Sequence, residues 1–174
     1  MYELSSFVFI IGMPGSGKSS IGKLLARALD KPFYDLDRVI ENDTGSSVTD
    51  FFKKYGEDKF RLLEADLLKQ TVLNEIPGVL STGGGTPCFH DSMSWMKKHG
   101  NTVFLDVPLT VLIERNRYSK HRPLLAQSKE EQLLSLYNKR LPVYRQAQLI
   151  FPYEEEGSAQ SNTNHLVQQL KQLS

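Results

Sequence analysis

The stretch Gly12-Met13-Pro14-Gly15-Ser16-Gly17-Lys18-Ser19 sets the architecture of this chain. It follows the apolar run 7–11, which predicts a buried strand. It leads into a segment with helical spacing of apolar residues at Ile21, Leu24, Leu25 and Ala28. A G-x-x-x-x-G-K-[ST] pattern between a strand and a helix predicts a phosphate-binding P-loop. An accidental glycine-rich turn is the alternative, and the flanking strand and helix weigh against it.

The residue types of this loop suit a bound triphosphate. Gly12, Gly15 and Gly17 allow positive φ angles and a close approach of the backbone to an anion. The following helix directs its free N–H groups and the positive end of its dipole at the same anion. We expect Lys18 to reach the outer phosphates and the Ser19 hydroxyl to bind Mg²⁺.

Composition limits the classes of protein to consider. With 174 residues, 40% of them apolar and 24% charged, the chain reads as one ordinary soluble domain, 1–174. The formal net charge of +1 gives no reason to expect nucleic acid or a membrane surface as a partner. No apolar run is long enough for a bilayer, and no signal-peptide pattern is expected at the N-terminus. The single Cys88 excludes an internal disulfide. We expect a cytoplasmic monomer.

Two aspartates end the next predicted strand, 32–37. Residues i and i+2 of a strand face the same side, and ligands of parallel sheets bind beyond the carboxyl ends of the strands. Close carboxylates need a compensating cation or donor. Asp35 therefore suits a place near Mg²⁺, through water, and Asp37 suits the base for a substrate hydroxyl. Alternatively, one of them only caps the helix that starts near Arg38.

The stretch 48–75 predicts a helix capped by Ser47 and interrupted at Gly56. Arg61 lies three residues before Glu64, so a surface ion pair of small energetic value is one interpretation of this arginine. For Phe52 and Phe60, the alternative is that they are ordinary residues of the hydrophobic core.

Three successive glycines, 83–85, follow a short predicted strand at 79–81. Glycine destabilises helices and strands. A run of three is therefore expected where a ligand contacts bare backbone and accepts hydrogen bonds from its N–H groups. A flexible connector is the alternative.

Basic residues gather in the segment 115–125, which follows a predicted helix that starts near Pro108. In a protein of nearly neutral charge, such a segment suggests a lid whose arginines close over phosphates and neutralise the transferring group. An exposed basic loop is the alternative interpretation.

The rest of the chain continues the alternation of strands and helices. Strands are predicted at 102–105 and 149–151, a helix at 129–141, a polar loop at 152–163, and a last helix with Leu166, Leu170 and Leu173 on one face. This order predicts a parallel sheet covered on both faces.

Taken together, these motifs resemble the shikimate kinase family from about Phe7 to Phe151. The specific part is their order: the P-loop, Asp35-Leu36-Asp37, Phe60-Arg61, Gly83-Gly84-Gly85, Arg122-Pro123-Leu124-Leu125 and Arg140-Leu141-Pro142-Val143-Tyr144. The resemblance implies a three-layer α/β P-loop kinase fold with a five-stranded parallel sheet. It also implies a helical substrate-binding subdomain at about 36–63 and a mobile lid at about 115–127.

The resemblance also implies roles for residues of the acceptor site. Asp37 would hold the shikimate hydroxyls and act as the base, and Arg61 and Arg140 would pair with the shikimate carboxylate in the fork geometry that arginine provides. The remaining shikimate-binding residues would be Gly83, Gly84, Gly85, Phe52 and Phe60.

On the donor side, the resemblance implies ATP held by Gly12, Pro14, Gly15, Ser16, Gly17, Lys18, Ser19, Ser20, Arg115 and Arg122. Arg115 would lie near the adenine, and Arg122 would descend with the lid onto the phosphates. Ser19 and Asp35 would place Mg²⁺. Lys18, Asp37 and Arg122 would form the catalytic set. The acidic segment 153–160 departs from the basic or proline-containing loop that the family carries around the adenine.

The expected reaction is therefore phosphorylation of shikimate by ATP, giving 3-phosphoshikimate for aromatic amino-acid synthesis. Another small-molecule kinase of the same fold, such as a gluconate or nucleoside monophosphate kinase, is the nearest rival. A nucleotide-gated regulatory protein that has lost the chemistry is a rival from a different class.

Overall fold

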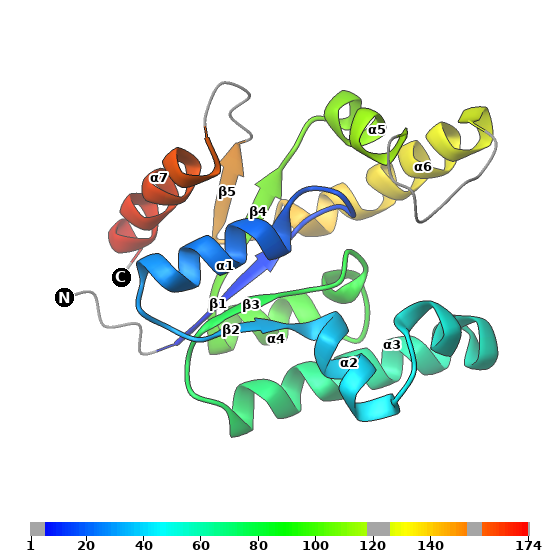
Figure 1. Ribbon diagram of the computed structural model, residues 1–174, viewed down its shortest axis with the longest axis horizontal. Helices are drawn as coiled ribbons and strands as arrows, with labels where there is room; N and C mark the ends of the chain where they lie inside the picture. Colours follow the sequence, from blue (N-terminus) through cyan, green and yellow to red (C-terminus); the bar gives the residue numbers. More distant parts are fainter. Residues whose placement is uncertain (1–5, 118–125, 153–157, 174) are drawn as a thin grey trace.

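The computed structural model describes residues 6–117, 126–152 and 158–173. Their elements, in chain order, are β1 (Phe7–Ile11), α1 (Lys18–Ala28), β2 (Phe33–Asp35), α2 (Leu36–Thr44), α3 (Val48–Asn74), β3 (Val79–Ser81), a 3₁₀ turn η1 (Thr86–Cys88), α4 (Ser92–His99), β4 (Gly100–Asp106), α5 (Leu109–Arg117), α6 (Ala126–Tyr144), β5 (Leu149–Pro152) and α7 (Ala159–Gln172). The five strands form one sheet in the order β2-β3-β1-β4-β5 (Figure 1).

Every strand pair in this sheet is parallel, as the alternation of elements predicts. Ser81 of β3 lies opposite Ile10 of β1 on one side and Asp35 of β2 on the other. Because parallel strands place their carboxyl ends at one edge, the segments that leave β1, β2 and β3 emerge side by side. That edge of the sheet is where a ligand site is expected.

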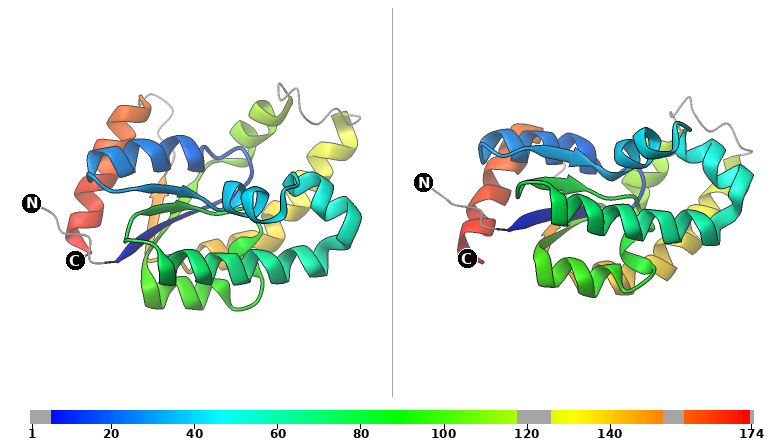
Figure 2. Two further views of the ribbon diagram at one scale, coloured as in Figure 1. Left: turned by 60° about the horizontal axis from the view of Figure 1, so that its bottom comes forward. Right: turned by 90° about the horizontal axis from the view of Figure 1, so that it is seen from below.

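Helices cover both faces of the sheet, which makes three layers (Figures 1 and 2). Alternate residues of β1 enter different cores. Val8 and Ile10 pack with residues of α1 and α7, whereas Phe7 and Phe9 pack in a core that includes residues of α2, α3, α4 and α6. The expected three-layer α/β fold with a five-stranded parallel sheet is therefore confirmed.

Several local expectations are confirmed. Ser47 caps α3 by accepting a hydrogen bond from the backbone N–H of Asp50. Gly56 interrupts the helix with φ 82° and ψ 172°, a conformation that glycine adopts without penalty. The chain therefore runs as two helical segments on either side of a kink at Gly56, as the sequence predicts.

Other boundaries differ from the predicted ones. β2 ends at Asp35, so Asp37 lies in the first turn of α2 and not in a strand. Helix α7 begins at Ala159, inside the segment predicted as loop. On α7, Leu166 and Leu170 are buried as predicted, but Leu173 is exposed because the helix ends there. Amphipathic spacing identifies a helix face and does not show where the last turn leaves the core.

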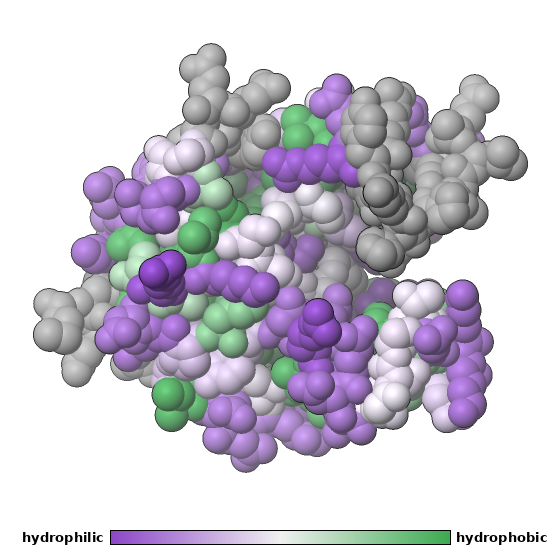
Figure 3. All heavy atoms as spheres, in the orientation of Figure 1, coloured by the Kyte–Doolittle hydropathy of each residue, from purple (hydrophilic) through white to green (hydrophobic). Residues whose placement is uncertain are grey.

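No helix of the described residues is long and apolar enough to cross a bilayer. On the face shown in Figure 3, hydrophobic side chains are scattered among hydrophilic ones.

Candidate active site

The P-loop backbone has the conformation that its glycines predict. Gly12, Gly15 and Gly17 have φ angles of 147°, 83° and 92°. Gly17 precedes the first turn of α1, and no side chain caps that end of the helix. The first N–H groups of α1 are therefore available to an anion, together with the positive end of the helix dipole. The Ser16 hydroxyl is buried without a hydrogen-bond partner, as a donor reserved for a ligand would be.

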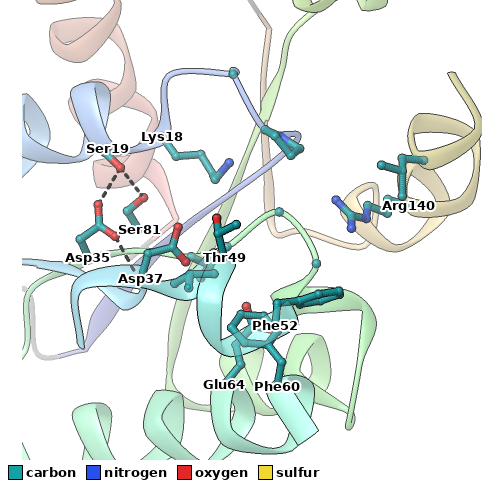
Figure 4. A pocket seen from close by; sticks show the side chains of 18 of the residues that line it. Lys18, Ser19, Asp35, Asp37, Thr49, Phe52, Phe60, Glu64, Ser81 and Arg140 are labelled. Carbon is teal, nitrogen blue, oxygen red and sulfur yellow. Dashed lines mark hydrogen bonds between the residues drawn. The ribbon is translucent and has the colours of Figure 1, made fainter. Parts of the chain in front are cut away.

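Lys18 folds over this loop. Its Nζ donates hydrogen bonds to the carbonyl oxygens of Gly12 (3.0 Å) and Met13 (2.9 Å). The pKa of Lys18 is lowered from 10.5 to about 8, mainly because the ammonium group is buried. The charge of Asp37 raises this pKa, that of Arg140 lowers it, and that of Asp35 raises it. The ammonium group therefore lies in the combined field of charged groups from β2, α2 and α6, and it is poorly hydrated (Figure 4).

Asp35 caps the following helix, which is one of the alternatives that the sequence left open, and it also contacts Ser19. Its Oδ1 accepts a hydrogen bond from the backbone N–H of Asp37 at 3.2 Å, so it caps α2. Its Oδ2 accepts a hydrogen bond from Ser19 Oγ at 2.8 Å, and Ser19 Oγ also lies 3.4 Å from Ser81 Oγ. Figure 4 shows these three side chains as one oxygen cluster beside the P-loop.

The oxygen cluster formed by Ser19, Asp35 and Ser81 suits Mg²⁺. This ion prefers hard oxygen ligands, and it is usually held by one or two protein groups together with phosphate oxygens and water. Among the described residues there is no group of three or more His, Cys, Asp or Glu side chains that could hold a metal by itself. The expected residues Ser19 and Asp35 therefore fit an ion brought by a nucleotide, and the Ser81 hydroxyl, which the sequence did not single out, is a further oxygen beside them.

Asp37 projects from α2 into a cleft of about 690 Å³ that Lys18 also lines (Figure 4). The side chain is accessible from the cleft. Desolvation by the surrounding protein raises the pKa of its carboxyl, the nearby Asp35 and Glu64 raise it further, Lys18 lowers it, and Glu41 raises it. A carboxylate with a raised pKa beside a lysine is a stronger proton acceptor than an ordinary surface aspartate.

Arg61 and Arg140 line the same cleft, from α3 and α6 respectively. Arg61 is buried, with 7% of its surface exposed, and so is Glu64, with 2%. Arg61 Nη1 donates to Glu64 Oε2 at 2.8 Å, and Glu64 Oε1 accepts a hydrogen bond from Thr86 Oγ1 at 2.7 Å. The Arg61–Glu64 pair predicted from spacing exists, but the interpretation of it as a surface ion pair is wrong. Glu64 fixes a buried guanidinium at the wall of the cleft.

The three successive glycines are explained by the side chains around them. A Cβ at Gly83 would lie 2.7 Å from Glu64 Oε1, and one at Gly85 would lie 2.4 Å from Arg61 Nη2. One at Gly84 would lie 2.8 Å from Pro14 Cδ of the P-loop and 3.1 Å from Arg140 Nη1. None of the three has a positive φ. The glycines are therefore explained by the close approach of the P-loop and of cleft side chains to this backbone.

Tyr144 joins this glycine segment to α6. Its side chain is fully buried, and its hydroxyl donates a hydrogen bond to the carbonyl oxygen of Gly84. The same hydroxyl lies 3.8 Å from Met13 Sδ in the P-loop. Burial raises the pKa of Tyr144, so the hydroxyl stays protonated and donates. Tyr144 thus holds the glycine segment and the Arg140-bearing helix together.

The two expected aromatic residues have different environments. Phe60 is buried in the core, and Phe52 is 37% exposed with its ring centroid 5.5 Å from that of Phe60. Both line the cleft. Sequence reasoning missed Val48, Thr49, Lys53, Thr82 and Leu136 as further lining residues. Thr49 could have been found, because it lies three residues before Phe52 on α3, and Lys53 in turn lies four residues after Thr49.

Arg115 lies away from the acceptor side. Its Nη1 donates to the carbonyl oxygen of Gly15 at 3.0 Å. It lines a second cavity of about 310 Å³, and this cavity shares Gly17 and Ser20 with the first. Arg122 and most of the expected lid fall at 118–125, outside the described residues.

These features define a phosphotransferase of the P-loop kinase class. Comparison with known proteins agrees. A family model described as shikimate kinase matches residues 14–171. The shikimate kinase of Bacteroides fragilis is 43% identical over 172 residues, which cover 95% of this chain and 94% of the relative. The shikimate kinase of Aquifex aeolicus is 40% identical over 142 residues, which cover 82% of this chain and 83% of the relative.

Solved structures give the same result. A crystal structure of shikimate kinase from Bacteroides thetaiotaomicron has a TM-score of 0.88 at 37% identity and covers 95% of this chain and 98% of that one. Shikimate kinase from Acinetobacter baumannii in complex with shikimate has a TM-score of 0.88 at 30% identity, with coverage of 99% and 96%. A gluconokinase from Sinorhizobium meliloti, at 17% identity and a TM-score of 0.61, shares the fold alone. The chain belongs to the shikimate kinase family.

The lowered pKa of Lys18 predicts a pH dependence of stability. Between about pH 8 and 10.5 the unfolded chain keeps the Lys18 proton that the folded protein has lost. Because the unfolded state binds more protons in that range, Lys18 makes the free energy of unfolding rise with pH there. In Lys18→Met this contribution is absent. Denaturant unfolding of both proteins at several pH values should therefore show that the free energy of unfolding of the wild type, relative to that of the variant, increases from pH 8 to 10.5. If the difference in free energy of unfolding between the two proteins stays constant over this pH range, the pKa of Lys18 is not lowered by folding.

Proposed function

We propose that this chain transfers the γ-phosphoryl group of ATP to the 3-hydroxyl of shikimate, giving 3-phosphoshikimate and ADP in aromatic amino-acid biosynthesis. The observation that carries the proposal is that Lys18, Asp37, Arg61 and Arg140 all line one cleft. Membership of the shikimate kinase family supports the same reaction. A relative of similar structure is described as a complex with shikimate.

On the donor side, the P-loop N–H groups and Lys18 bind the phosphates of ATP, and the base lies toward the second cavity beside Arg115. Ser19 and Asp35 would hold Mg²⁺, with the Ser81 hydroxyl next to them. The ion, when bound, neutralises phosphate oxygens and holds the donor in place. Arg122, in the segment proposed as a lid, adds a further positive charge on closure.

On the acceptor side, the substrate needs partners for a carboxylate and for hydroxyl groups. Arg61 and Arg140 are the carboxylate partners, because each guanidinium can present two parallel donors. Arg61 Nη1 donates to Glu64, and its Nε and Nη2 donate to Glu57 Oε1 at 3.3 and 3.4 Å. The guanidinium is therefore fixed in place, and the substrate carboxylate would replace Glu57 at these two donors. The backbone at Gly83, Gly84 and Gly85, with Phe52 and Phe60, completes the proposed site in the subdomain 36–63 and around it.

The chemical step follows from this placement. Asp37 accepts the proton of the 3-hydroxyl as its oxygen forms a bond to the γ-phosphorus. The bond from that phosphorus to the bridging oxygen of the β-phosphate breaks, and ADP leaves with the electron pair. Lys18 stabilises the negative charge on the phosphate oxygens during transfer. Catalysis is therefore mainly positioning and charge neutralisation.

The alternative is a gluconate or nucleoside monophosphate kinase of the same fold. Similarity to the solved gluconokinase is limited to the fold and does not support that activity. The proposal extends to a cytoplasmic monomer that binds neither nucleic acid nor membrane, as composition predicts.

A coupled assay of ADP release tests the reaction. With purified protein, ATP and Mg²⁺, we expect addition of shikimate to raise the rate well above the rate with ATP alone. Gluconate and nucleoside monophosphates serve as the comparison panel and should leave the rate at that background. Turnover with a member of the panel and none with shikimate would overturn the substrate assignment.

Asp37→Asn tests the proposed base. The amide cannot accept the hydroxyl proton, so we expect turnover to fall about a hundredfold or more while ATP still binds. Asp43→Asn, an exposed position of the same helix, is the matched control and should keep wild-type turnover. Steady-state kinetics and ATP titration of both variants give the answer. An Asp37→Asn enzyme of normal turnover would show that the base is elsewhere.

A further inference from the structure

Arg61 is held by two carboxylates of its own helix, and the two hold it differently. Glu64 is buried, with 2% of its side chain exposed, and its Oε2 accepts a hydrogen bond from Nη1 at 2.8 Å. Glu57 is 50% exposed, and its Oε1 accepts from Nε at 3.3 Å and from Nη2 at 3.4 Å. The ring centroids of Phe60 and Phe89 lie 5.1 and 4.7 Å from the guanidinium carbon. Glu64 and the two rings therefore fix the guanidinium without help from Glu57.

The hydrogen bonds to Glu57 make poor use of the arginine edge that they occupy. Nε and Nη2 present two parallel N–H groups, which match the two oxygens of a carboxylate. Here both donors share one oxygen, at distances beyond the usual range for N–H···O bonds. An exposed ion pair of this kind contributes little to stability. A carboxylate that offers each donor its own oxygen would therefore be preferred at this edge.

Glu57 can leave Arg61 more easily than Arg61 can leave its place. Glu57 directly follows the kink at Gly56, and half of its side chain is already in water, so its freed carboxylate is solvated. The side chain of Arg61 is only 9% exposed and stays paired with Glu64. A buried guanidinium edge without a partner is unfavourable. The edge therefore passes from one carboxylate to another and does not stay empty.

We propose that Glu57 is a positioning residue that competes with the acceptor: it occupies Arg61 in the free protein, is displaced by the acceptor's carboxylate, and takes Arg61 back when the product leaves. The proposal rests on the proposed function, in which that carboxylate binds Arg61, and it adds that Glu57 limits the affinity of this contact. A ligand with the same ring and no charge leaves Glu57 in place. Glu57 therefore lowers the affinity for carboxylate ligands alone. The product keeps the carboxylate and meets the same competition, which favours its release.

Glu57→Gln tests this competition through a gain of affinity. The variant keeps the shape of the side chain and loses its charge, so its hydrogen bonds to Arg61 are weaker. In calorimetric titration we expect it to bind shikimate about three- to fivefold more tightly than the wild type does, as loss of an exposed ion pair implies. The affinity for the methyl ester of shikimate should not rise, because the ester does not displace Glu57. Damage to the site would instead lower both affinities.

Asp58→Asn is the matched control. It removes one negative charge from the next residue of the same helix, which is also exposed. Because salt screens the attraction between an anion and exposed charges, this variant should bind shikimate less than about twofold more tightly than the wild type. Thermal unfolding of each variant reports whether it folds.

Two results would overturn the role of Glu57 and leave the proposed function standing if shikimate raises ADP release. One is an equal gain of affinity in Asp58→Asn and Glu57→Gln, which would reduce the effect to net charge. The other is wild-type affinity for shikimate in folded Glu57→Gln. Absence of shikimate binding by the wild type would overturn both the proposed function and the role of Glu57.

Discussion

The position of β3 between β1 and β2 in a parallel sheet is the constraint on which the site depends. The P-loop leaves β1, Asp35 ends β2 and the glycine segment follows β3, and parallel pairing places these three exits at one edge. The register puts Ser81 directly opposite Asp35 and Ile10. Phosphate-binding, metal-binding and acceptor-binding groups from distant parts of the sequence therefore meet without any long loop.

Charge balance within the cleft is the second organising feature. Lys18, Arg61 and Arg140 bring positive charge to it, and Asp37 and Glu64 oppose them. Desolvation lowers the pKa of Lys18 and raises the pKa of Asp37, so both pKa values differ from those of the same groups in water. Such an arrangement is costly in the free protein and is expected to be relieved by a ligand that carries a carboxylate, a hydroxyl and phosphates. The same groups then serve binding and transfer.

Local sequence patterns predicted the P-loop, the parallel sheet and the break at Gly56, because each depends on residues close together in the chain. The burial of polar and charged side chains could not be predicted this way. The Arg61–Glu64 spacing is visible in the sequence, but its meaning depends on Thr86, 22 residues beyond Glu64. The glycine run suggested a bound ligand, whereas the structure adds the close approach of Glu64, Arg140 and Arg61.

The central claim is that two arginines from different helices hold one substrate carboxylate while Asp37 faces its hydroxyl. Calorimetric titration with shikimate and with its methyl ester tests this most directly, because the ester keeps the ring and hydroxyls and loses the charge. We predict that wild-type protein binds shikimate at least tenfold more tightly than the ester, and that the preference largely disappears in Arg140→Met. Equal affinity of the wild type for the acid and the ester would contradict the account.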